Sequence, residues 1–181
     1  MRIPLLSLIV AASLVACAST GPQRVTDADK PHAIGTGTPV SVSWGDPAQF
    51  TELRYSQNRH EAARGDWVEE LASYVAKRVA NVLPSGETVE VEIVDIERAG
   101  EYEWAYGWND DVRVLRDVYP PRMLVRFQRT DADGRVIAEG ERRLSDLAYL
   151  TGSQPLSTSD PLRFEKRMID QWVRKEFVNR R

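Results

Sequence analysis

The spacing of apolar residues alternates between two periods along the chain, and this pattern limits the folds that the chain can adopt. In residues 40–44 and 89–93, apolar side chains occupy every second position, which predicts half-buried strands. In residues 68–82 and 168–177 they recur every three or four positions, which predicts amphipathic helices. A chain that carries both patterns is expected to bury sheet faces against helix stripes.

Capping signals predict where the helices begin. Asp46 and Asp160 each precede a proline, and an acid followed by proline is typical of a helix N-cap and first helical position. They predict a short helix through residue 53 and the start of the last helix. Asp66 and Glu69 have the spacing of a capping box before the helix predicted over 68–82.

The order of the elements indicates the fold class. Residues 123–127 and 136–141 predict two strands joined by a turn at 131–134. Strands at 40–44 and 89–96 precede them, and a fifth strand can lie between 97 and 122. We predict an α+β fold: a mostly antiparallel sheet of about four to five strands, with two main helices packed on one face.

The first 16 residues have the pattern of an export signal. Arg2 precedes an apolar run from residue 3 to residue 18, which is 16 residues long and shorter than the ~20 needed to span a bilayer. Residues 14–17 read Leu-Val-Ala-Cys and resemble a bacterial lipobox. The resemblance implies cleavage before Cys17 and lipid attachment to it. The alternative is an ordinary signal peptide with a cysteine beside its cleavage site.

The address and the domain boundaries follow from this segment. Cys17 is the only cysteine, so an exported chain has no intramolecular disulfide to form. Ala18 and Ser19 follow it, and in lipoproteins such residues imply transfer to the outer membrane, on its periplasmic face. Residues 17–38 are polar and predict a flexible tether, and residues 39–181 predict a single domain.

The charge balance excludes some partners. The chain has 27 acidic and 24 basic residues and a net charge of −3, which becomes −4 once Arg2 is removed with the signal. A mildly acidic protein without a concentrated basic surface is not expected to bind nucleic acid. No sequence motif for a cofactor, a metal site or a catalytic nucleophile is present, so no cofactor is expected.

Aromatic residues gather between residues 99 and 122. Tyr102, Trp104, Tyr106 and Trp108 occupy every second position, and with Tyr119 they make five of the fifteen aromatics. In an extended chain the first four rings lie on one face. Such a face suits a protein partner or a sugar ring, but it also suits ordinary packing of a strand against a core. Both interpretations stay open at the level of sequence.

Charged residues surround these rings and could form a cluster: Asp110, Asp111, Arg113, Arg116, Asp117 and Arg122. Paired acids could act as catalysts if one carboxyl had a raised pKa in a cleft. Adjacent aspartates could bind a hard cation, although no further ligand has the required spacing. Surface salt bridges are the simplest interpretation.

The chain resembles the bacterial family catalogued as domain of unknown function 3016, from about residue 40 to residue 177. The residues that carry the resemblance lie in three stretches: Asp111-Val-Arg113 with Asp117-Val-Tyr119-Pro-Pro-Arg122, the hairpin 131–140 with Glu141, and Asp160-Pro-Leu-Arg163 leading to Trp172. The resemblance implies an exported protein of Gram-negative bacteria. It implies no activity, cofactor or catalytic residue.

Three hypotheses about function follow. The leading one is a non-enzymatic lipoprotein that is held in the membrane by lipid on Cys17 and binds an envelope protein through residues 102–122. The second is a carbohydrate-binding module for peptidoglycan that uses the same aromatic rings. The third and weaker one is a carboxylate-based hydrolase that uses Asp110, Asp111 or Asp117.

Overall fold

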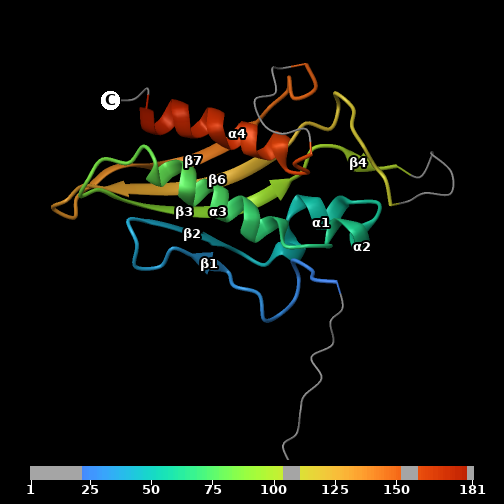
Figure 1. The fold of residues 1–181 in the computed structure, drawn as a ribbon, viewed down its shortest axis with the longest axis horizontal. Coiled ribbons are helices and arrows are strands. Elements are labelled where there is room, and N and C mark those ends of the chain that lie inside the picture. Colours follow the sequence, from blue (N-terminus) through green and yellow to red (C-terminus); the bar gives the residue numbers. More distant parts are fainter. Residues whose placement is uncertain (1–21, 104–110, 152–158, 179–181) are drawn as a thin grey trace, which may run out of the picture.

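A five-stranded sheet covered on one face by two main helices forms the body of the protein (Figure 1). The computed structural model describes residues 22–103, 111–151 and 159–178. The strands lie in the order β1-β2-β3-β6-β7, and their bounds are Ala33–Ile34, Val40–Trp44, Thr88–Glu97, Arg122–Thr130 and Val136–Ser145. The predicted α+β class is confirmed.

Strand pairing is antiparallel except between β2 and β3. A parallel pair needs a long crossover, and here the crossover holds four helical elements: η1 (Pro47–Gln49), α1 (Thr51–Tyr55), α2 (Arg59–Ala62) and α3 (Trp67–Ala80). β6 and β7 form the predicted hairpin. Its turn is closed by Asp131, whose Oδ1 accepts hydrogen bonds from Asp133 N and Arg135 N, both at 2.9 Å.

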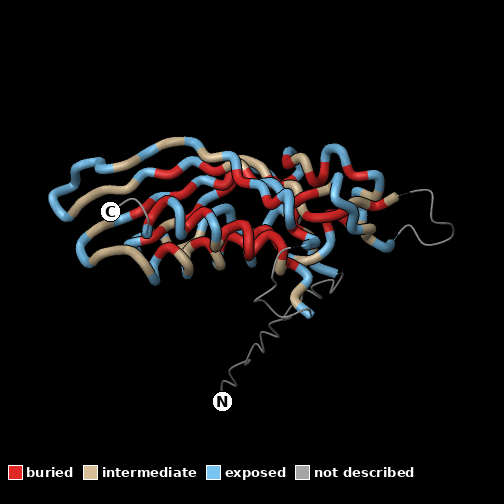
Figure 2. Tube along the Cα trace, turned by 90° about the horizontal axis from the view of Figure 1, so that it is seen from above, coloured by how far each residue is buried: buried red, intermediate tan, exposed pale blue. Residues whose placement is uncertain are grey.

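Alternation along the strands separates a buried face from an open one. In β3, Val89, Val91 and Ile93 are buried, whereas Glu90 and Glu92 are exposed. A bulge between Ile93 and Asp95 shifts the register, so that Ile96 is buried as well. Figure 2 shows this alternation of buried and exposed residues along the chain. The polar residues between the apolar ones therefore face away from the helices.

The helices fill the other side of the core. α4 (Arg163–Val173) lies beside α3 and continues into a π-helical turn, η3 (Arg174–Val178). Phe127 of β6, Trp172 of α4 and Phe177 of η3 meet edge to face, with ring centroids 5.5–6.2 Å apart. All the apolar residues predicted for the last helix are buried: Met168, Ile169, Trp172, Val173 and Phe177. None of the helices in the described ranges combines the length and the apolar character that a membrane crossing requires.

The helix starts differ in part from those predicted. Asp46 caps η1 as expected, accepting from Ala48 N at 2.9 Å. The capping box at Asp66 is not formed, because the Asp66 side chain makes no bond to the first turn of α3. The last helix begins at Arg163, and Asp160 orders the preceding turn by accepting from Leu162 N at 2.9 Å.

Residues 22–38, which the sequence assigns to a flexible tether, pack on the domain. Val25 is buried and its N–H donates to Ala63 O at 2.9 Å, and β1 pairs antiparallel with β2. Ile34 is packed against the core. This packing could not be predicted from the sequence, because two separate apolar contacts and a two-residue strand produce no periodic pattern.

The turn of the β6–β7 hairpin leads to a test of how much Asp131 stabilises the fold. Replacing Asp131 with alanine removes two backbone hydrogen bonds, so we expect the free energy of unfolding to fall by about 1 kcal/mol in urea titration. Asp133→Ala is the matched control. Its side chain makes a 3.5 Å ion pair with Arg135 on the surface, and such pairs contribute little. Equal losses in both variants would contradict the role assigned to Asp131.

Candidate functional site

The segment rich in aromatic residues begins and ends on a small second sheet. β4 (Glu101–Tyr102) and β5 (Arg113–Val114) pair antiparallel. They belong to the tip segment, by which we mean residues 99–103 and 111–122. Figure 1 shows β4 beside α1 and α2, at the opposite end of the molecule from the β6–β7 hairpin. Gly100 N donates to Tyr119 O at 3.0 Å, which joins the two halves of the tip segment.

A buried carboxylate holds the tip segment to the rest of the fold. Glu52 of α1 has a side chain only 3% exposed. Its Oε1 accepts from Arg98 Nη2 at 2.9 Å and from the Arg113 guanidinium, and its Oε2 accepts from Arg98 N at 2.9 Å. Arg98 follows β3 directly and Arg113 begins β5. One carboxylate thus connects three segments that are far apart in the sequence.

The two arginines make further contacts on the way to Glu52. Arg113 donates to Ala99 O at 3.2 Å and lies 5.0 Å from the centre of the Tyr102 ring. Arg98 lies 4.5 Å from the Trp67 ring. Burial by itself would lower the pKa of Arg113, but the Glu52 carboxylate, together with Tyr102 and Glu101, outweighs burial and the net change in this pKa is upward. Arg113 therefore stays positively charged beside Glu52.

A second buried acid lies beneath the start of the tip segment. Glu165 of α4 accepts from Ala99 N at 2.7 Å through Oε1, while its Oε2 is buried and has no hydrogen-bond partner among the described residues. Burial raises the pKa of the Glu165 carboxyl, and the hydrogen bond from Ala99 opposes this only in part. Tyr149 and Phe164 pack beside Ala99 in a small separate core. The Tyr149 hydroxyl donates to Arg116 O at 2.7 Å.

The structure separates the charged residues that could have formed a cluster. Arg113 pairs with Glu52, Arg116 pairs with Glu103 at 2.7 Å, and Arg122 pairs with Glu97 at 2.8 Å. Asp111 and Asp117 are exposed. Among these described residues no joint site is formed, because β5, the following turn and β6 direct them to different parts of the surface.

The aromatic residues divide in the same way. Tyr102 is buried beneath Arg113, which is the packing role considered for the stripe. Tyr119 is half-buried, and its hydrogen bond to the Glu103 carboxylate raises the pKa of its hydroxyl. Trp104, Tyr106, Trp108 and Asp110 lie outside the described residues, as does Cys17.

The tip segment is held in place mainly by two buried acids, Glu52 and Glu165, that the sequence analysis did not single out. Glu52 precedes the buried Leu53 in a short helix, and Glu165 lies four residues before the buried Ile169. Each acid therefore falls within an apolar helix face, which is an uncommon place for a charge. That position was the available signal. Arg113 belongs to the predicted charged cluster, but nothing in the sequence indicated its pairing with Glu52 or that of Arg98, because both arginines lie at strand ends among other charged residues.

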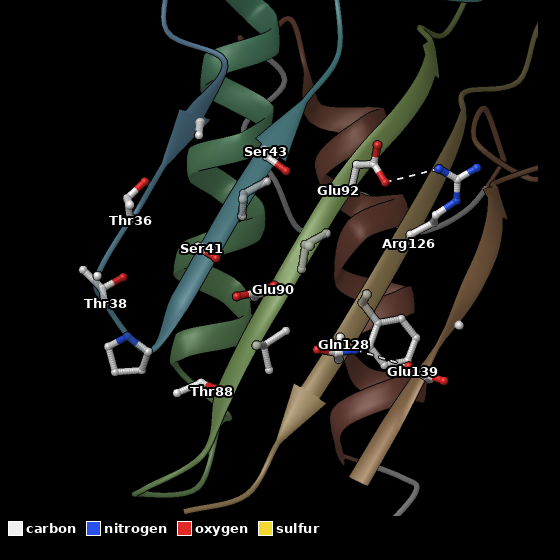
Figure 3. Close-up of a pocket in the computed structure, with 18 of the residues that line it drawn as sticks. Thr36, Thr38, Ser41, Ser43, Thr88, Glu90, Glu92, Arg126, Gln128 and Glu139 are labelled. Atoms are coloured by element: carbon white, nitrogen blue, oxygen red, sulfur yellow. Dashed lines mark hydrogen bonds and ion pairs between the residues drawn. The ribbon is translucent and has the colours of Figure 1, made fainter. Parts of the chain in front are cut away.

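The open face of the sheet forms a separate, shallow hollow of about 1000 Å³ (Figure 3). Hydroxyl groups and carboxylates on the sheet face line this hollow. The labelled side chains are Thr36, Thr38, Ser41, Ser43, Thr88, Glu90, Glu92, Arg126, Gln128 and Glu139. Arg126 lies between Glu92 and Glu141, at 3.2 Å from each carboxylate. Its hydrogen bonds to these two acids, first of all Glu92, raise the pKa of the guanidinium. The face offers polar contacts without an exposed aromatic ring among its lining residues.

These features define a small α+β domain with a buried ion cluster at one end and an uncovered polar sheet face. The chain belongs to the family described as "Protein of unknown function (DUF3016)", whose model matches residues 38–175. Comparison with curated proteins and with solved structures gives no match. Within the described ranges no three His, Cys, Asp or Glu side chains are grouped so that they could hold a metal ion.

The buried ion cluster leads to a stability test. In Glu52→Gln, two half-buried guanidinium groups lose their buried carboxylate partner, so we expect the free energy of unfolding to fall by about 3 kcal/mol in urea titration. Glu97→Gln is the control, because it removes an ion pair that is exposed on the surface and is expected to cost less than about 1 kcal/mol. Similar small losses in both variants would show that Glu52 holds nothing in place.

Glu165 leads to a test by pH. Between the ordinary carboxyl pKa and its raised value in the folded protein, the folded chain keeps a proton that the unfolded chain releases. Stability therefore falls as the pH rises through this interval. The variant Glu165→Gln should lack this fall, which is measured by urea titration at a series of pH values. A variant curve parallel to that of the wild type would contradict a raised pKa at Glu165.

Proposed function

We propose that the protein is a non-enzymatic lipoprotein of the outer membrane that faces the periplasm and binds an envelope protein. The observation that carries this proposal is a set of exposed apolar side chains on the tip segment and on the turn hydrogen-bonded to it. We call this set the tip surface: Val112, Leu115, Val118, Leu147 and Leu150. Among the described residues, nine large apolar side chains are exposed, and these are five of them. Val118 is 69% and Leu147 is 75% exposed.

The two parts of the tip surface are held against each other. Tyr149, between Leu147 and Leu150, donates its hydroxyl hydrogen bond to Arg116 O at 2.7 Å, and Asp146 N donates to Pro121 O at 3.4 Å. Leu115 lies over Gly100, where an added Cβ would come within 2.8 Å of its Cδ2. A surface that is ordered before binding loses less entropy when it docks. Exposed apolar side chains grouped in this way are typical of a protein interface.

The attachment of the chain supports a partner near the membrane. Gly65 N donates to Gln23 O at 2.7 Å, so the chain is already packed on the domain at residue 23. Gln23 is six positions after Cys17, a stretch that reaches at most about 20 Å when extended. α2 and α1 lie at the end of the sheet that carries the tip segment (Figure 1). Lipid on Cys17 would therefore keep the tip surface close to the bilayer.

A second candidate is carbohydrate binding, as in a peptidoglycan-binding module. The observation that favours it is the hollow on the open sheet face, which is lined by hydroxyl groups, carboxylates and the Gln128 amide. Such groups hydrogen-bond sugar hydroxyls. The hydrolase hypothesis has less support, because Asp111 and Asp117 lie exposed on the surface.

Photo-crosslinking in living cells tests the binding surface. A photoreactive residue is placed at Leu115 or at Leu147 of the intact lipoprotein, with Ser73, an exposed residue of α3, as the control position. We expect one discrete adduct, identified by mass spectrometry as the same envelope protein, from both tip positions and not from position 73. Adducts of equal yield from all three positions would contradict a specific tip surface.

Two further variants complete this experiment. Cys17→Ser should leave the membrane fraction and lose the adduct while keeping its folded far-ultraviolet spectrum, since the lipid supplies membrane attachment. Leu115→Asp with Leu147→Asp should stay in the membrane and lose the adduct. An adduct that persists in the double aspartate variant would show that the partner binds elsewhere, and sedimentation with purified sacculi would then test the sugar-binding candidate.

A further inference from the structure

The outer edge of β7 is an extended row of backbone groups at one side of the sheet. β7 is ten residues long and stands last in the strand order. Asp146 N donates to Pro121 O, and one register then runs unbroken from Ser145 to Ala138. Alternate residues of an antiparallel strand bond to the same neighbour. The even-numbered residues therefore bond to β6, and the N–H and C=O groups of the odd-numbered ones face away from it.

The two edges of the sheet differ in how they are protected. At the other edge, β1 pairs with β2, and the Thr38 hydroxyl donates to Val40 O at 2.8 Å. Along β7, Arg142 donates from Nη1 to Glu141 O at 3.0 Å, which leaves that carbonyl oxygen one further lone pair. A long strand edge of this kind is a template for pairing with another strand.

We propose that β7 pairs antiparallel with β7 of a second copy of this chain. The charges on the edge are self-complementary in one register. When Glu141 lies opposite Arg143 of the second copy, the two-fold axis places Arg143 opposite Glu141 of the second copy as well. Both are odd-numbered residues, so their backbone N–H and C=O groups face the open edge. The two residues can therefore form a hydrogen-bonded pair of the antiparallel ladder. Opposite charges at directly facing positions stabilise a strand pair.

The same register is compatible with the inner side of the sheet. The two Arg142 side chains meet at the axis, and each is already neutralised by its own Glu176, at 2.8 and 3.1 Å. Leu144 lies opposite Gly140 of the second copy. Beside Leu144, a hollow of about 230 Å³ runs between β7 and α4, lined in part by Met168 and Trp172. Gly140 adds no side chain there, so the second strand can approach without overfilling the hollow.

The test is the mass of the full-length protein in detergent micelles, measured by sedimentation equilibrium over a range of protein concentrations. We expect the wild type to form a dimer. Arg143→Glu places glutamates opposite each other and should weaken the dimer at least about tenfold. The charge-swapped variant E141R/R143E restores complementary pairs and should return to within about threefold of the wild type. Arg135→Glu, in the nearby turn, is the matched control and should not change dimerisation.

Thermal unfolding of each variant shows whether it is folded, because Glu141 also pairs with Arg126 within the chain. A wild type that stays monomeric at all concentrations overturns the proposal. So does a dimer that Arg143→Glu leaves unchanged, or one that the charge swap fails to restore while the variant is folded. An adduct formed with another protein at the β7 edge, in place of a dimer, would equally contradict a second copy as the occupant.

Discussion

The carboxylate of Glu52 is the interaction on which the end of the molecule depends. It is buried, and a buried charge is stable only when partners neutralise it. Its partners are Arg98, which follows β3, and Arg113, which begins β5. Because both arginines reach the same carboxylate, Arg98 after β3 and Arg113 of β5 are both fixed beside α1. The tip segment begins next to Arg98, contains Arg113 and ends where the chain rejoins the five-stranded sheet at β6.

The remaining features follow from a fold with helices on a single face of its sheet. α3 and α4 bury the apolar side of the strands, whereas the opposite side carries hydroxyl groups, acids and Arg126. Among the described residues, no further strand lies beside β7, which ends the sheet. The domain thus presents three distinct surfaces: an apolar one at the tip, a polar one on the open sheet face, and a charged strand edge. Each is suited to a different kind of contact.

Much of the architecture could be predicted from the sequence because its periods are regular. The alternation in 89–93 and the helical period in 68–82 both report burial directly, and the turn at 131–134 has residues that specify its geometry. Interactions between distant segments have no such signature. The pairing of Glu52 with Arg113 spans 61 positions, and the packing of residues 22–38 rests on Val25 and a two-residue strand. Asp66 shows the reverse case, a capping pattern without the capping bond.

Amide hydrogen exchange of Arg113→Met, compared with the wild type, shows whether the Glu52 cluster holds the tip segment in place. Gly100 N and Tyr119 N form backbone hydrogen bonds within the tip segment. We expect these amides to lose protection in the variant while those of α3 and β6 keep theirs, since only the tip segment would open locally. Unchanged protection at Gly100 and Tyr119, or an equal loss throughout the domain, would contradict it.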